Sequence, residues 1–156
     1  MIVQVIQLCT FYINKGSVKM IELLTHSNDK YIAFKDIFVS LEDFKNKNPY
    51  NAHFKIEVKS GAYGGAGEIE TNLKDFIKFG NSIKKMYESL QGKALLQDIL
   101  HQTFVLFECD KRGHIVVSGF IEEYETHQTL KFSFVTDQSS LKSFMEQLNT
   151  FIGSIE

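Results

Sequence analysis

The chain has 156 residues, a length typical of one domain with a substantial hydrophobic core. Apolar residues make up 44% and charged residues 23% of the sequence, which argues against intrinsic disorder. The net charge of −2 argues against direct binding of nucleic acid, because such proteins usually carry a basic surplus. The two cysteines, Cys9 and Cys109, form no CxxC motif, so we expect free thiols in a reducing cytoplasm and neither a disulfide scaffold nor a zinc site.

Residues 1–19 are expected to be a leader outside the folded domain. Residues 1–13 are apolar but too short to span a bilayer, and they lack the features of a signal peptide. Lys15-Gly16-Ser17 can be encoded by a purine run that resembles a bacterial ribosome-binding site, shortly before Met20. We therefore expect translation to start at Met20 and residues 20–156 to form a single α+β domain.

The first part of the domain is predicted to consist of strands. Residues 21–25 and 31–40 are rich in β-branched and aromatic side chains, and the turn-forming residues 26–29 separate them. Residues 44–51 contain the only proline and are predicted to be a surface loop. Residues 54–58 alternate apolar and polar side chains, the period of a strand with one buried face.

A glycine-rich stretch, residues 61–67 (GAYGGAG), is predicted to be a flexible hairpin turn. Glycine-rich loops can bind phosphate through backbone N–H groups, but they then need a helix N-terminus directly behind them. Residues 68–70 (EIE) follow instead in a strand pattern, and no Lys-Ser or Lys-Thr pair completes a P-loop. The remaining alternative to a plain turn is a binding loop that presents Tyr63.

The next element is predicted to be an amphipathic helix that begins after an Asn72 cap and runs to about Gln91. Gly92 follows where a C′ glycine is expected. The polar face carries four lysines, which form either a solvated surface or a guide for an acidic partner: Lys74, Lys78, Lys84 and Lys85.

Strands dominate the second half of the sequence. Residues 94–100 fit a strand better than a helix, and firmer strand patterns follow at residues 103–109, 115–124 and 130–135. Short connections between them indicate an antiparallel meander, and Asp137 is predicted to cap a final amphipathic helix. The fold class is therefore predicted to be α+β, with an antiparallel sheet of about six or seven strands and two amphipathic helices on one face.

The sequence contains no arrangement that predicts catalysis, a cofactor or a metal ion. The five histidines lack the spacing of helix-borne ligands, and His114 beside Asp110 lies on a tight turn without a visible pocket. Cys109 is expected to be buried, and no serine lies in a G-x-S-x-G motif.

Acidic residues are expected to cluster around one edge of the meander, with an aromatic side chain among them. This set comprises Glu108, Asp110, Glu122, Glu123, Tyr124 and Glu125. Carboxylates beside an aromatic side chain suit a basic protein partner, because charge steers the encounter and the ring supplies desolvated contact. The alternative is a solvated sheet edge that the charges protect from aggregation. With Tyr63, these residues are the candidates for partner binding.

Two segments carry a resemblance to a known family. Residues 113–119 (GHIVVSG) and 130–141 (LKFSFVTDQSSL) resemble the "G-H-[IV]-x-V-x-G" strand and the "L-x-F-x-F-x-x-D-Q-[TS]-x-L" strand-to-helix junction of WapI-type bacterial immunity proteins. Residues 90–94 (LQGKA) are similar to an "L-x-G-K-A" segment of the same family. The resemblance extends over residues 20–155 and leaves the leader unmatched.

The resemblance implies a cytoplasmic antitoxin. Such proteins bind the C-terminal toxic domain of a cell-wall-associated or Rhs-repeat protein, often a nuclease that acts on tRNA, and protect the producing cell from its siblings. We interpret Asp137 and Gln138 as a helix cap that fixes the last strand to the last helix, and not as toxin contacts. We therefore expect an immunity protein that neutralises a cognate toxin domain by stoichiometric binding, without catalysis. The alternative is a small-ligand-binding or regulatory domain that uses the glycine-rich loop and Tyr63.

Overall fold

The computed structural model describes residues 20–155, so the predicted leader lies outside the described residues. The chain forms two successive units, each with four consecutive antiparallel strands followed by a helix. The first unit comprises β1 (Met20–Leu24), β2 (Lys30–Val39), the short α2 (Leu41–Lys45), β3 (Ala52–Ser60), β4 (Tyr63–Thr71) and α3 (Leu73–Ser89). The second comprises β5 (Lys93–Gln97), β6 (Phe104–Cys109), β7 (Ile115–Glu123), β8 (Gln128–Thr136) and α4 (Gln138–Ile155).

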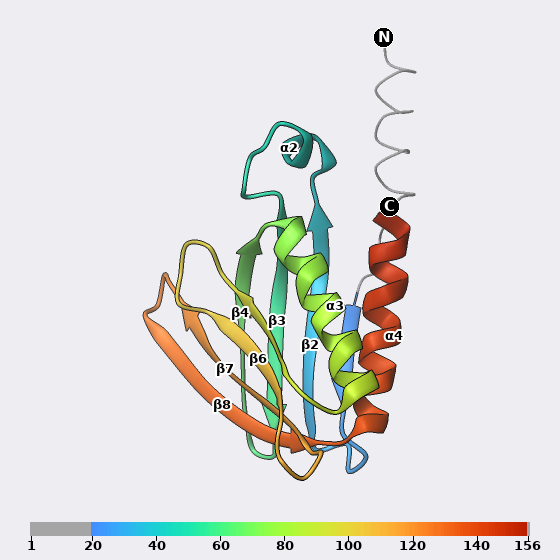
Figure 1. Ribbon diagram of the computed structural model, residues 1–156. Helices are drawn as coiled ribbons and strands as arrows, with labels where there is room; N and C mark the ends of the chain where they lie inside the picture. The colour runs from blue at the N-terminus through green and yellow to red at the C-terminus, as the bar shows by residue number, and fades with distance from the viewer. Residues whose placement is uncertain (1–19, 156) are drawn as a thin grey trace.

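The α+β class and the antiparallel pairing are confirmed, whereas the number of sheets differs from the prediction. Within the described residues, eight strands form two sheets of four, in the orders β1-β2-β3-β4 and β5-β6-β7-β8. In Figure 1, α3 and α4 lie side by side across the strands of the first sheet. The prediction of a plain loop over residues 44–51 missed α2, which Ser40 caps by accepting a hydrogen bond from the Asp43 N–H (3.2 Å).

A cluster of buried phenylalanines joins the two units into one hydrophobic core. Phe34 of β2 lies against Phe144 of α4, with ring centroids 5.6 Å apart. Phe107 of β6 stacks on the same Phe144 ring at 5.1 Å, and it also contacts Phe79 of α3 at 5.7 Å. Both helices therefore contact the buried faces of both sheets, and neither unit buries its apolar face alone.

The glycine-rich stretch is a strand over most of its length, so the prediction of a flexible turn across residues 61–67 was wrong. Only Gly61 and Ala62 lie outside β3 and β4. The glycines of β4 instead permit close packing against the second sheet. A Cβ added at Gly65 would lie 2.9 Å from Leu130 Cδ2, and one added at Gly67 would overlap Ile121 Cγ2. The missing side chains therefore let β4 cross β7 and β8 at close range.

The predicted helix caps are confirmed at both N-termini. Asn72 accepts a hydrogen bond from the Lys74 N–H (2.9 Å) at the start of α3, and Asp137 accepts one from the Ser140 N–H (3.0 Å) in α4. The helix α3 ends at Ser89, and Leu90 then takes the left-handed conformation (φ 52°), while Gly92 has the positive φ (91°) that suits a glycine after the helix. Within residues 20–155, no helix is long and apolar enough to cross a bilayer.

Candidate functional site: an acidic loop surface

The predicted acidic cluster is divided between the two ends of the second sheet. Glu108 pairs with Val116, and Glu122 lies six residues further along β7 (116 to 122). At about 3.3 Å per residue, that separation is roughly 20 Å. Successive turns of a meander lie at opposite ends of the strands, so Asp110 in the β6–β7 turn cannot approach Glu125 in the β7–β8 turn. The prediction that all these residues cluster at one edge was therefore wrong.

Tyr63 also lies apart from the β7–β8 turn. It is the exposed first residue of β4, beside the β3–β4 turn. Figure 1 shows that turn at the lower end of the view, whereas the β7–β8 turn lies at the left. Tyr63 therefore does not belong to the surface that the other aromatic candidate, Tyr124, forms.

The structure brings the β5–β6 and β7–β8 connections together at one end of the second sheet. The Gln102 N–H donates to Glu122 Oε2 (3.3 Å), and the His101 and Tyr124 rings stack with centroids 4.9 Å apart. Tyr124 remains 63% exposed. We name this region the acidic loop surface and define it by Ile99, Leu100, His101, Glu122, Glu123, Tyr124 and Glu125.

Charge and exposure suit the acidic loop surface to contact with a basic protein. Residues 98–103 and 122–127 contain four carboxylates and neither lysine nor arginine. The two large aliphatic side chains of the first connection, Ile99 and Leu100, are exposed beside them. Sequence reasoning missed these two residues and His101, because they belong to a connection that is distant in the chain from residues 122–125.

A buried carboxylate holds the first of these connections in place. Asp98 is only 6% exposed, and its Oδ1 accepts hydrogen bonds from the N–H groups of Leu100 (2.7 Å) and His101 (2.6 Å). Its Oδ2 accepts a third from the Glu70 N–H (2.7 Å), which ties the connection to β4. Charge-assisted bonds to backbone N–H groups are among the stronger protein hydrogen bonds. Asp98 therefore positions Leu100 and His101 before any partner arrives.

Polar side chains also order the β7–β8 connection. The Glu122 N–H donates to the buried hydroxyl of Thr103 (3.0 Å), which fixes β7 against the start of β6. Glu123 Oε2 accepts hydrogen bonds from the N–H (3.1 Å) and the hydroxyl of Thr126. The carboxylates at this end are thus presented by a defined backbone, which lowers the ordering cost of binding.

At the other end of the sheet, Asp110 has a local structural role. Its Oδ1 accepts hydrogen bonds from the N–H groups of Arg112 (2.7 Å) and His114 (2.9 Å), and its Oδ2 lies 3.1 Å from His114 Nδ1. Desolvation opposes ionisation, but the backbone hydrogen bonds from His114 and Arg112 hold the pKa of Asp110 below its ordinary value. The arrangement closes the β6–β7 turn.

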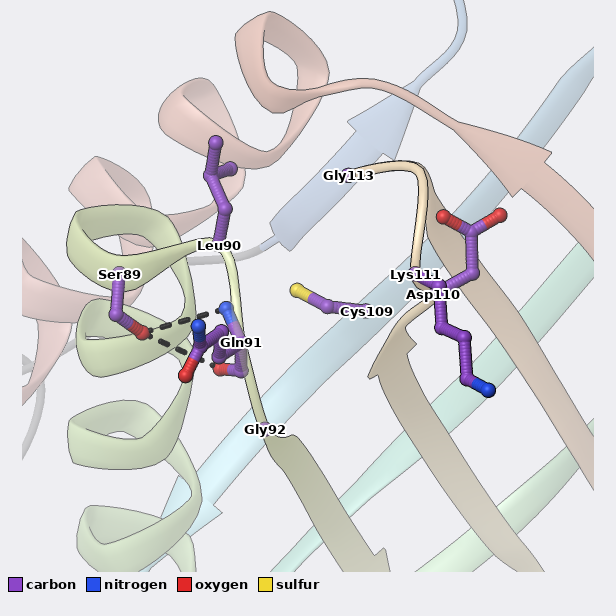
Figure 2. A pocket seen from close by; sticks show the side chains of 8 residues that line it. All are labelled: Ser89, Leu90, Gln91, Gly92, Cys109, Asp110, Lys111 and Gly113. Carbon is purple, nitrogen blue, oxygen red and sulfur yellow. Dashed lines mark hydrogen bonds between the residues drawn. The ribbon is translucent and has the colours of Figure 1, made fainter.

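An open hollow of about 540 Å³ lies between the end of α3 and the β6–β7 turn. Figure 2 shows the Cys109 side chain pointing into it from the end of β6, and Lys111 pointing away. Cys109 is half-buried, although it was expected to be buried. Burial, together with the carboxylates of Asp110 and Glu108, raises the pKa of its thiol. A protonated thiol is a poor nucleophile, so the hollow lacks an activated cysteine.

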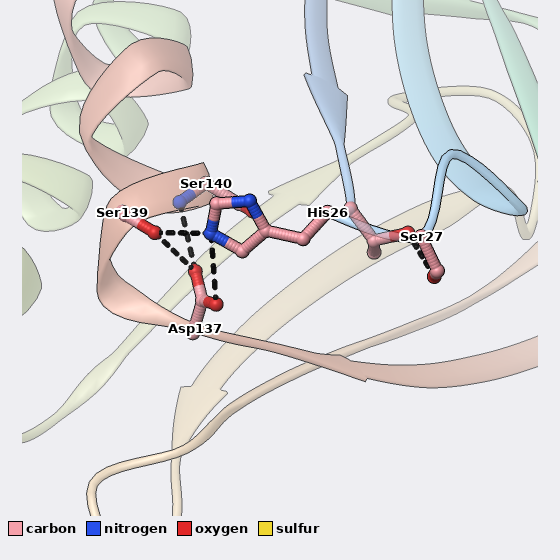
Figure 3. Close-up of polar contacts among 6 residues, drawn as sticks. His26, Ser27, Asp137, Ser139 and Ser140 are labelled. Atoms are coloured by element: carbon pink, nitrogen blue, oxygen red, sulfur yellow. Dashed lines mark hydrogen bonds and ion pairs between the residues drawn. The ribbon is translucent and has the colours of Figure 1, made fainter.

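His26, Asp137 and Ser139 lie together at the start of α4 (Figure 3), but they do not form a hydrolase triad. The His26 Nε2 atom lies 2.7 Å from Ser139 Oγ and 3.3 Å from Asp137 Oδ2, so both partners contact the same ring nitrogen. In a catalytic triad the aspartate holds the opposite nitrogen from the serine. The backbone N–H of Ser140 is the main cause that lowers the pKa of Asp137, as a helix cap requires. Within residues 20–155, no group of three or more His, Cys, Asp or Glu side chains is placed to bind a metal ion.

Comparisons with known proteins agree with the motif resemblance. The model of the "Immunity protein WapI-like family" matches residues 30–155. No curated protein matches the chain. One similar solved structure is described as "Crystal structures of trypanosoma bruciei MRP1/MRP2"; it is 7% identical, with a TM-score of 0.49, over 96% of this chain and 92% of the other. Because the family model covers most of the sequence, the chain belongs to the immunity protein WapI-like family.

Proposed function

We propose that this protein neutralises a cognate toxin domain by binding it stoichiometrically in the cytoplasm of the producing cell. The observation that carries the proposal is the family match over residues 30–155. An immunity protein needs no chemistry of its own, because tight occlusion of the toxin is sufficient. Asp137 serves as a helix cap, and the pKa of the Cys109 thiol is raised, and both observations are compatible with a non-catalytic role.

We further propose that the toxin is a nuclease and that the acidic loop surface contacts it. Nucleases bind a phosphate backbone through lysine and arginine side chains, which a basic active-site surface supplies. The carboxylates of Glu122, Glu123 and Glu125 oppose such a surface, and Tyr124 offers an aromatic anchor between them. Complementary charge of this kind raises the association rate and selects the correct partner.

Co-expression tests the proposal directly. The C-terminal domain of the large secreted protein encoded beside this gene is expressed with and without the full chain, and survival and co-purification are scored. Rescue together with an equimolar complex is the expected result. If the chain neither relieves the toxicity nor binds the toxin domain, this pairing is rejected. Thermal shifts of the purified chain with small metabolites, in the absence of any protein complex, would favour the small-ligand-binding alternative.

A further inference from the structure

The outer face of the second sheet, directed away from the helices and the core, carries six apolar side chains among its polar ones. Successive side chains of a strand point to opposite faces, so the residues between the buried ones lie on this outer face. Its apolar members are Leu95, Phe104, Leu106, Val116, Phe120 and Val135. Leu95 and Val135 are 50% and 52% exposed, and the other four are half-buried.

The strand register groups these side chains into three apolar pairs, which together are called the patch. Leu95 pairs with Leu106 across β5 and β6, and Phe104 pairs with Phe120 across β6 and β7. Val116 pairs with Val135 across β7 and β8. Directly paired side chains are roughly 5 Å apart, and the three pairs together include residues of all four strands. Outward polar residues lie beside these pairs, namely Lys93, Glu108, Ser118, Lys131 and Ser133.

The first sheet has the same strand order, and it provides an internal comparison. Its outer face carries charged side chains, and Lys35 and Glu57 form an ion pair on it (2.9 Å). A sheet with one solvated face is normally polar on that face. By contrast, residues 115–121 of β7 (IVVSGFI) are mostly apolar on both faces, a pattern typical of a strand that is covered on both sides. Apolar side chains grouped in this way on a solvent-facing surface are typical of an interaction site.

We propose that this outer face is the docking surface for the apolar centre of the toxin domain, an inference that rests on the proposed function. Charge identifies the occupant. Glu122 is the next outward residue after Phe120 on β7, so the apolar patch continues directly into the acidic loop surface. Within residues 20–155, Glu122, Glu123 and Glu125 form no ion pair with lysine or arginine. The patch therefore fits a protein surface that is apolar at its centre and basic along one side.

Affinity measurements with the purified C-terminal toxin domain test the docking surface. The double variant Leu95→Asp/Val135→Asp places one carboxylate on each edge strand of the sheet, at the two most exposed positions of the patch, and it is expected to raise the Kd at least about tenfold. Leu24→Asp is the matched control, because Leu24 is also an exposed strand leucine (42%) but lies on β1 of the first sheet. The control is expected to bind within about twofold of the unmodified chain.

Circular dichroism and thermal unfolding establish that each variant is folded. If the aspartate variant does not fold, Leu95→Gln/Val135→Thr is used, with an expected loss of at least about fivefold. A folded variant whose Kd stays within twofold of the unmodified chain would overturn the docking surface while leaving the proposed function intact. Failure of the unmodified chain to bind would overturn both proposals. The unmodified chain could also be a dimer that the aspartate substitutions convert to a monomer without weakening toxin binding. That result would assign the face to a second copy of the chain and refute the proposal.

Discussion

Replacement of Asp98 by alanine is predicted to destabilise the protein by about 3 kcal/mol. The substitution removes three hydrogen bonds from backbone N–H groups, those of Glu70, Leu100 and His101. Hydrogen bonds to a charged group contribute about 1.5–3 kcal/mol each, and a buried donor left without a partner costs about 1–3 kcal/mol. Water can reach part of this connection, so each lost bond is assigned about 1 kcal/mol, the lower limit for a buried donor without a partner, and the three together give about 3 kcal/mol.

Asp98→Asn is predicted to lower the free energy of unfolding by about half as much as Asp98→Ala, because an amide has only one acceptor oxygen. That oxygen can still accept from Leu100 and His101, whereas the amide nitrogen cannot accept from the Glu70 N–H. Glu125→Ala is the control on the same surface, and it is expected to change stability by less than about 0.5 kcal/mol. Urea unfolding monitored by circular dichroism gives the free energies. A loss below about 1 kcal/mol for Asp98→Ala would refute the role assigned to this carboxylate.

Three further predictions concern packing, capping and charge. Gly67→Ala is predicted to lower the free energy of unfolding by about 1–3 kcal/mol, because the added methyl group would overlap Ile121. The control is Gly153→Ala in α4, where the methyl group meets open space, and it should raise the free energy of unfolding by up to about 1 kcal/mol in the same urea titration. Asp137→Ala is predicted to cost about 1 kcal/mol at neutral pH. Because the folded-state pKa of Asp137 is lowered, the stabilisation by its carboxylate is present above about pH 4 and is lost as the pH falls. The free energies of unfolding of Asp137→Ala and the unmodified chain should therefore converge in acid. Exchange of the three glutamates of the acidic loop surface for lysine is predicted to weaken toxin binding at least about tenfold at low salt and less at high salt; equal effects at both salt concentrations would contradict an electrostatic contact.

The local structure could be predicted because its signals lie close together in the sequence. Alternation of apolar side chains indicated the strands, helical spacing indicated α3 and α4, and Asn72 and Asp137 marked the caps. The pairing of strands into two sheets has no such local signal. It depends on where α3 turns the chain, and on glycines such as Gly65 that permit close contact with a strand more than sixty residues away.

The candidate site was predicted only in part, for the same reason. Glu122, Glu123, Tyr124 and Glu125 were identified as a group because they are contiguous. The residues that complete the surface come from the β5–β6 connection, and the buried Asp98 that positions them has no distinctive motif. Strand directions decide which turns share an end of a sheet. The acidic composition therefore indicated a candidate surface but not its arrangement.

Calorimetric titration of the purified full chain with the C-terminal toxin domain tests the central claim most directly. Stoichiometric immunity predicts saturation at one chain per toxin domain, together with loss of toxin activity at the same ratio. Neutralisation at a ratio far below one would mean that the protein acts catalytically on the toxin or its product. Absence of binding, with toxicity unrelieved, would contradict the assignment of this toxin as the partner and with it the proposed docking surface.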